Sequence, residues 1–138
     1  MKNEFIPYDI ALAMKEIGFD EPCVATFHDN SGGEIEFTFG MFHHPKKNSE
    51  ANTVSGTFIG KNGCYAPLYQ QAFRWFRKKY RLLHFITPNT TRGGWDIQVI
   101  HYNGYKILYE NNDNDLKYEE AELACLKKLI EIKPKQKL

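Results

Sequence analysis

Five histidines offer the side chain that most often acts near neutral pH as a general acid, a general base or a metal ligand. His43 and His44 are adjacent, so on a strand they would face opposite ways, and no cysteine or carboxylate stands near them at a ligand-like spacing. His28, His84 and His101 fall in expected strands, and they would converge only if those strands are neighbours. Packed or surface histidines are the commoner outcome, so we expect no metal site and no cofactor.

Other patterns typical of catalysis are also absent from the sequence. The motifs HExxH, GxSxG and GxxxxGK[ST] do not occur. Cys64 stands just before an expected helix, whose N-terminus could lower the pKa of its thiol, but no histidine is placed beside it. Glycine loops at 31–33, 60–63 and 92–94 could present amides to an anion, although each also fits a plain turn. The sequence therefore leans towards a protein that is not an enzyme.

The stretch 66–86 contains a concentration of large apolar residues and of positively charged residues. Its aromatic residues recur at three- and four-residue spacing, which indicates an amphipathic helix with a basic outer face. A solvated charged back on a core helix is the ordinary interpretation. The alternative is a surface that contacts phosphates and stacks on bases. The expected ligand-binding residues are Arg74, Trp75, Arg77, Lys78, Arg81, Arg92, Trp95, His43 and His44.

Three classes of function follow from these residues, in decreasing order of support. The first is a non-enzymatic binding module for a nucleotide, a cyclic oligonucleotide or another phosphate-bearing ligand, nucleic acid included. The second is a protein-interaction or assembly factor, for example a homodimer that uses Trp75 and an open sheet face as its interface. The third is a small nucleotide hydrolase in which histidines serve as acid and base.

Composition favours one compact domain over residues 1–133, followed by a short basic tail at 134–138. A chain of 138 residues that is 42% hydrophobic and 14% aromatic can fill a single core. The net charge of +1 excludes an overall field that would drive non-specific binding to nucleic acids or membranes. Three dispersed cysteines, no signal segment and no apolar run long enough to span a membrane predict a cytoplasmic protein.

Hydrophobic periodicity predicts three helices. The first begins at Pro7 and ends at Gly18, the second begins at Pro67, and the third runs from about Lys117 to Ile132. Strands are expected at 23–28, 34–40, 82–87, 95–102 and 105–110, with turns at 29–33, 103–104 and 111–115. Asn103 and Gly104 are the strongest hairpin signal, because both residue types accept positive φ.

Residues 41–63 form the least regular part, in which only Val54, Phe58 and Ile59 suggest a short strand. Connections this long are often mobile or functional, so we expect a lid or binding loop that contains His43 and His44. The elements together predict an α+β fold in the order α-β-β-α-β-β-β-α. We expect one antiparallel sheet of about five or six strands, with three helices on one face.

Three segments, PYDIALAMKEIGFDEPC, APLYQQAFRWFRKKY and YEEAELACLKKLIEI, resemble a family of short uncharacterised proteins of Bacteroidetes bacteria and their bacteriophages. The segments cover about a third of the chain. The resemblance implies a phage association and supplies no activity, ligand or catalytic residue. Similar proteins tend to have Thr before the Tyr-Glu-Glu that opens the last helix, whereas this chain has Lys117, so Asp115 is an alternative N-cap.

Overall fold

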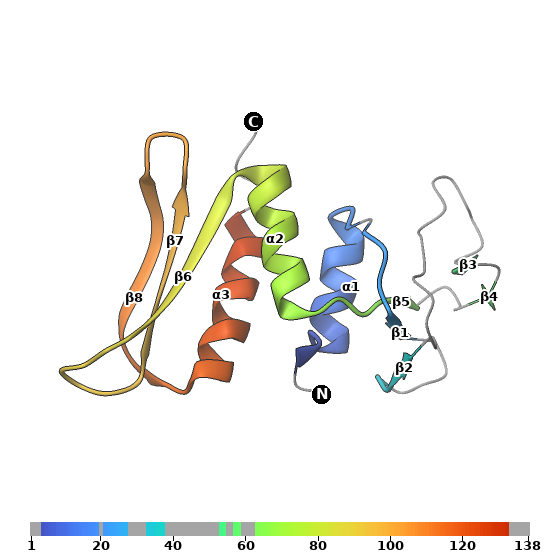
Figure 1. Ribbon diagram of the computed structural model, residues 1–138, viewed down its shortest axis with the longest axis horizontal. Coiled ribbons are helices and arrows are strands. Elements are labelled where there is room, and N and C mark those ends of the chain that lie inside the picture. Colours follow the sequence, from blue (N-terminus) through green and yellow to red (C-terminus); the bar gives the residue numbers. More distant parts are fainter. Residues whose placement is uncertain are drawn as a thin grey trace. The chain divides into compact units, whose positions relative to one another are not determined.

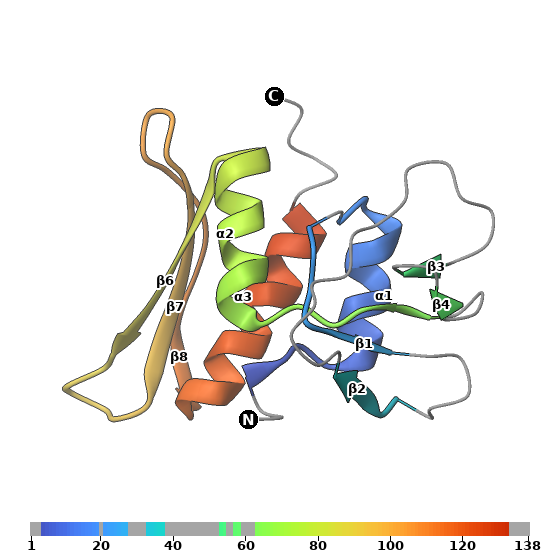
Figure 2. The same ribbon diagram turned by 45° about the vertical axis from the view of Figure 1, so that its right-hand side comes forward.

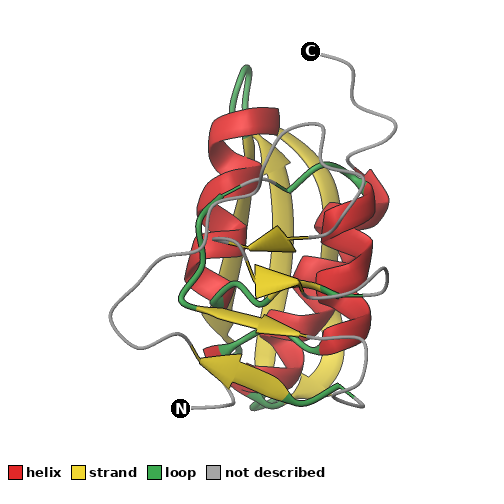
Figure 3. Ribbon diagram, turned by 90° about the vertical axis from the view of Figure 1, so that its right-hand side faces the viewer, coloured by secondary structure: helices red, strands yellow, loops and turns green. Residues whose placement is uncertain are grey.

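The computed structural model describes residues 4–19, 21–27, 33–37, 53–54, 57–58 and 63–132, and Figure 3 draws the remainder in grey. The chain divides into two compact units, Met1–Tyr69 and Gln70–Leu138, and each is described by itself (Figure 1). The single domain expected over 1–133 stays a prediction. The expected tail and the histidine pair at 43–44 lie outside the described residues.

The first unit contains α1 (Tyr8–Glu16), which buries Ile10, Ala11 and Met14 on one side. Gly18 has φ of +93°, as predicted for a residue that ends a helix. Its amide donates to the Lys15 carbonyl at 3.1 Å, and the Phe19 amide donates to the Met14 carbonyl at 2.9 Å. These two bonds form a Schellman motif, which satisfies carbonyls at the end of the helix.

Three short strands lie beside α1 in the order β2-β1-β5: β2 (Ile35–Phe37), β1 (Ala25–Phe27) and β5 (Cys64–Tyr65). Both pairs are antiparallel, so the predicted pairing of the first two β runs is confirmed. A separate antiparallel pair joins β3 (Thr53–Val54) to β4 (Thr57–Phe58). The structure therefore has two paired strands where the sequence predicts one short strand.

The second unit is built on the antiparallel sheet β6-β7-β8, formed by β6 (Leu82–Pro88), β7 (Trp95–His101) and β8 (Lys106–Leu116). The helices α2 (Tyr69–Tyr80) and α3 (Tyr118–Ile132) cover the same face of this sheet (Figures 1 and 2). The largest fully buried side chains of this unit are Phe76, Leu82, Ile97, Val99, Leu126 and Leu129.

The second helix begins two residues later than the sequence predicts. Leu68 forms an isolated antiparallel bridge with Phe5, and the Pro67 carbonyl accepts the Ile6 amide at 3.0 Å. Because these backbone groups pair with an extended segment of the first unit, they cannot also open a helix. Pro67 is therefore buried before the helix instead of at its first position.

The turn expected at 111–115 is wrong, because β8 continues through it to Leu116. Asn111 pairs with Ile97 and Leu116 pairs with Trp95, with one register shift between these two pairs. Asn and Asp are poor strand formers, and residues 112–115, between these two pairs, form an irregularity in the strand ladder.

The hairpin expected at Asn103 and Gly104 is present between His101 and Lys106, which are paired residues. The residues with positive φ lie one position later, however, at Gly104 (+88°) and Tyr105 (+53°). The loop therefore has four residues, and its left-handed positions include a tyrosine instead of the asparagine.

Lys117 occupies the position before the first residue of α3, and its amide donates to the Glu120 Oε1 at 3.4 Å. This is half of a capping box, in which the third helical residue reaches back to the N-cap amide. Lysine cannot supply the reciprocal acceptor. Asp115 does not take the N-cap position suggested as an alternative, since it lies within β8.

The α+β class and the three helices are confirmed. The single sheet of five or six strands is wrong for the described residues, whose strands form antiparallel sheets of three, two and three strands. Helix α1 accompanies the first unit, whereas α2 and α3 cover the sheet of the second. None of the helices in the described residues is long and apolar enough to span a membrane.

Candidate functional site

The outer face of α2 is basic, as the sequence predicts. Arg74, Arg77 and Lys78 are exposed, and Arg77 and Lys78 follow Arg74 by three and four residues on the helix. Like charges at this spacing destabilise a helix by about 0.2–0.5 kcal/mol per pair. Cations in the last turn gain a comparable amount from the helix dipole. An anion bound here would relieve the repulsion between these cations.

Arg81 follows the helix and is held by the hairpin between β7 and β8. Its φ of +56° is left-handed, and the Tyr102 amide donates to its carbonyl at 3.1 Å. The Arg81 Nη1 donates to the Asn103 Oδ1 at 3.3 Å, and the guanidinium lies 5.6 Å from the Tyr102 ring centroid. A left-handed backbone costs a non-glycine residue about 1 kcal/mol or more. The conformation that orients Arg81 therefore lowers the stability of the folded protein.

Acidic residues are almost absent from this part of the chain. Between Ala66 and Tyr109 the sequence contains seven arginines and lysines but a single acid, Asp96. Asp96 pairs with Thr87 across the sheet and accepts from the Asn89 side chain at 3.3 and 3.4 Å. It is five residues from His101, or about 17 Å along a strand that rises about 3.4 Å per residue.

We name the cluster Arg77, Lys78, Arg81 and Lys106 the cationic end of the second unit. Leu82, His101 and Lys106 are successive partners across the three strands, so helix end and hairpin lie at the same end of the sheet (Figure 1). All four side chains are exposed. Within the described part of the chain, none of the four forms an ion pair with an acidic residue.

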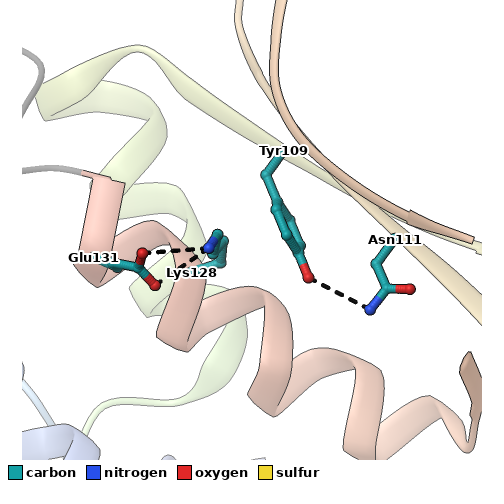
Figure 4. Close-up of polar contacts among 4 residues, drawn as sticks. All are labelled: Tyr109, Asn111, Lys128 and Glu131. Carbon is teal, nitrogen blue, oxygen red and sulfur yellow. Dashed lines mark hydrogen bonds and ion pairs between the residues drawn. The ribbon is translucent and has the colours of Figure 1, made fainter.

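Lys128 on α3 shows what an internally satisfied cation looks like in this protein (Figure 4). Its Nζ donates to both carboxylate oxygens of Glu131 at 3.3 Å and lies 4.5 Å from the Tyr109 ring centroid. The Asn111 Nδ2 in turn donates to the Tyr109 hydroxyl at 3.4 Å. Lys128 therefore has an acidic partner, unlike the cations of the cationic end.

Trp75 does not belong to the exposed surface predicted for it. Its side chain is only 3% exposed, and its ring packs edge-on against Phe76 and Tyr80 at 5.0 and 5.5 Å. The Lys79 Nζ lies 5.1 Å from the Trp75 ring centroid. Trp75 sits at the edge of the apolar stripe, and the indole turns inwards because burial of so large a ring is strongly favourable.

Arg92 and Trp95 are also separated from the α2 cations. Arg92 is exposed in the loop after β6, and Trp95 pairs with Pro88 and packs edge-on against Tyr118 at 5.0 Å. The length of β6, about 20 Å at the usual rise, lies between this loop and Arg81. These two predicted residues therefore lie at the opposite end of the sheet from the cationic end.

His84 lies beneath the basic helix instead of in a catalytic cluster. Its ring stacks on Phe73 with centroids 3.7 Å apart and planes 11° apart. Burial, together with the positive charge of Arg77, lowers the pKa of His84 from 6.5 to about 4. The neutral imidazole is thus the native form near neutral pH, as a packing residue requires.

The thiols also lack the environment of a nucleophile. Cys23, Cys64 and Cys125 are buried, and burial raises the pKa of Cys64 to about 12 although Lys15 lowers it in part. The same cause raises the pKa of Cys125 to about 12. Lys15 donates to the Gly63 carbonyl at 2.8 Å, which joins α1 to β5. No group of three metal-ligating side chains occurs among the residues that the structure describes.

The hairpin residues Tyr102, Asn103, Tyr105 and Lys106 were not predicted as site residues. Tyr105 is 77% exposed, more than the other exposed large hydrophobic residues Phe37, Phe85, Ile107 and Tyr118 of the described part of the chain. Two sequence signals could have identified this region: the acid-free run around it and the Asn-Gly pair, which predicts that β7 and β8 turn back near the basic helix end.

Comparison of the chain with models of known protein families, with curated proteins and with solved structures gives no match.

Proposed function

We propose that the protein is a non-enzymatic binding module whose cationic end holds a phosphate-bearing ligand. The observation that carries this proposal is the exposure of Arg77, Lys78 and Arg81 within the run 66–109, whose single acidic residue, Asp96, is five residues from His101 at the cationic end. Arginine offers planar, bidentate donors to phosphate oxygens, and lysine adds a point charge. Arg81 is already oriented by Asn103 and Tyr102, so binding loses less side-chain freedom there.

The wider setting of this proposal is a cytoplasmic protein with a phage association. Three buried thiols suit a reducing compartment. The phage association comes from the sequence resemblance alone.

The double variant Arg77→Ala/Lys78→Ala is expected to bind inorganic tripolyphosphate at least about fivefold more weakly than wild type at low ionic strength. Both side chains are exposed and alanine favours helix, so the fold is kept. Isothermal titration calorimetry measures the affinity. Because the interaction is ionic, raising the salt concentration weakens wild-type binding as well.

The matched control is Lys117→Ala/Lys127→Ala, which removes the same charge from exposed positions on and beside α3. This control is expected to keep tripolyphosphate affinity within about twofold of wild type. Arg81→Gly is a second test, because glycine relieves the left-handed backbone while removing the guanidinium. Equal weakening in the control, or no binding by wild type, would exclude the cationic end as a phosphate site.

Self-association is a second candidate function, favoured by the sheet face opposite the helices. Leu83, Ile100 and Ile107 are paired across the three strands, with Phe85 on the same face as Leu83. Phe85 is 42% exposed and Ile107 is 53% exposed. An uncharged apolar row can meet a copy of itself, whereas a cationic surface repels its copy. A monomer mass by light scattering at every concentration would remove this candidate.

A further inference from the structure

We infer that the ligand of the cationic end is single-stranded nucleic acid, with a base stacked on Tyr105 and phosphates held by Arg77, Lys78 and Arg81. This inference rests on the proposed function and names its ligand class. Tyr105 replaces Trp75 as the stacking residue, because Trp75 is buried whereas Tyr105 is 77% exposed.

The exposure of the cations favours a polymer over a small molecule. A small ligand usually loses most of its surface to a concave pocket. Arg77, Lys78, Arg81 and Lys106 instead stand out from two elements, the end of α2 and the β7–β8 hairpin. An extended polyanion can contact several such cations in succession, each through a different phosphate, and releases counterions at each contact.

The tip of the hairpin favours an unpaired strand over a duplex. Tyr105 holds φ of +53°, a conformation that is costly for a large side chain, and lies next to Gly104 at +88°. A Cβ added at Gly104 would have no heavy atom within 4 Å, so the space around the tip is open. An aromatic face presented in this way can stack on an unpaired base, which a duplex does not offer.

The neighbouring residues supply the remaining contacts. Tyr102 already stacks with the Arg81 guanidinium, and Asn103 accepts from the same group. The Arg81 guanidinium is therefore fixed in direction by the hairpin before a strand binds. Lys106 follows Tyr105 directly, so a base on the ring would place its phosphate near this ammonium.

The test uses the full chain and a fluorescein-labelled oligodeoxythymidine of about 15 nucleotides, near the upper end of known single-strand site sizes. Fluorescence anisotropy measures the affinity. Tyr105→Ala is expected to weaken binding about tenfold, the usual effect of losing one base–aromatic stack. Tyr105→Phe keeps the ring and is expected to stay within about twofold of wild type, which separates stacking from the hydroxyl.

Tripolyphosphate distinguishes failure of this inference from failure of the proposed function. Tyr105→Ala should leave tripolyphosphate affinity unchanged, because that probe has no base to stack. An unlabelled duplex of the same length should compete less well than the single strand. Equal competition by the duplex, or oligonucleotide affinity unaffected by Tyr105→Ala, would overturn the single-strand inference while phosphate binding stands. If wild type binds neither probe, both proposals fail.

Discussion

Gly94→Ala is expected to lower the free energy of unfolding by about 3 kcal/mol or more, because two costs coincide at this residue. Its φ of +75° is left-handed, and a Cβ there would lie 2.7 Å from the Asp115 Oδ1. The same Cβ would lie 3.0 Å from the Asp115 Cα and 3.2 Å from its carbonyl carbon. These backbone atoms belong to β8 and cannot move aside as a side chain can.

Gly104→Ala is the matched control. Its φ of +88° carries a similar backbone cost, but its Cβ would meet nothing within 4 Å. We expect this variant to lose only about 1 kcal/mol. Urea denaturation followed by tryptophan fluorescence measures both values. A similar loss of unfolding free energy in the two variants would show that the backbone of β8 does not clash with a Cβ at position 94. Adding Asp115→Ala to Gly94→Ala should not restore stability, because the backbone clash remains.

Acidification from pH 6.5 to about 4 is expected to remove about 2–3 kcal/mol of stability through His84 alone. The pKa of this histidine is lowered in the folded protein, so above pH 6.5 the imidazole is neutral in both states. As the pH falls, the unfolded chain takes up the proton first and is stabilised. Below about pH 4 the folded protein is protonated as well, and the loss stops growing.

His84→Gln isolates this contribution, since carboxylates also titrate in the range. The difference in unfolding free energy between pH 7 and pH 4 should be smaller in the variant by the amount assigned to His84. Arg77→Ala removes the second cause of the lowered pKa and should raise the pKa of His84. A proton titration of the imidazole by NMR would show this. An unchanged pH dependence in His84→Gln would contradict the buried, neutral histidine.

Local signals in the sequence predicted much of the fold. Pro7 and Gly18 mark the limits of the first helix, because the imide and the left-handed glycine act through backbone geometry alone. The end of α3 at Ile132 and the antiparallel hairpins follow from periodicity and turn residues in the same way. Positive charge on the outer face of α2 was likewise visible in residue spacing.

The parts that failed depend on long-range pairing. β8 extends through residues 112–115 because Asn111 and Leu116 on either side of them pair with β7, and Leu68 leaves the helix because Phe5 pairs with it. Residue patterns along the sequence do not indicate which strands become neighbours. The prediction of one sheet therefore did not separate the strands into several sheets. The residues of the candidate site also changed because they depend on long-range packing. Trp75 packs into the interior, and Trp95 lies at the end of the sheet opposite the cationic end. The β7–β8 hairpin instead brings Tyr105 to the cationic end.

The segregation of charge also gives the second unit a polarity that the chain's net charge of +1 conceals. Glu119 and Glu120 are exposed at the start of α3, which follows the Leu116–Trp95 end of the sheet, while the cationic end lies at the other end. Two molecules can therefore attract each other pole to pole, and such a contact does not close on itself. Because such a contact is ionic, it weakens once the Debye length falls to about 10 Å.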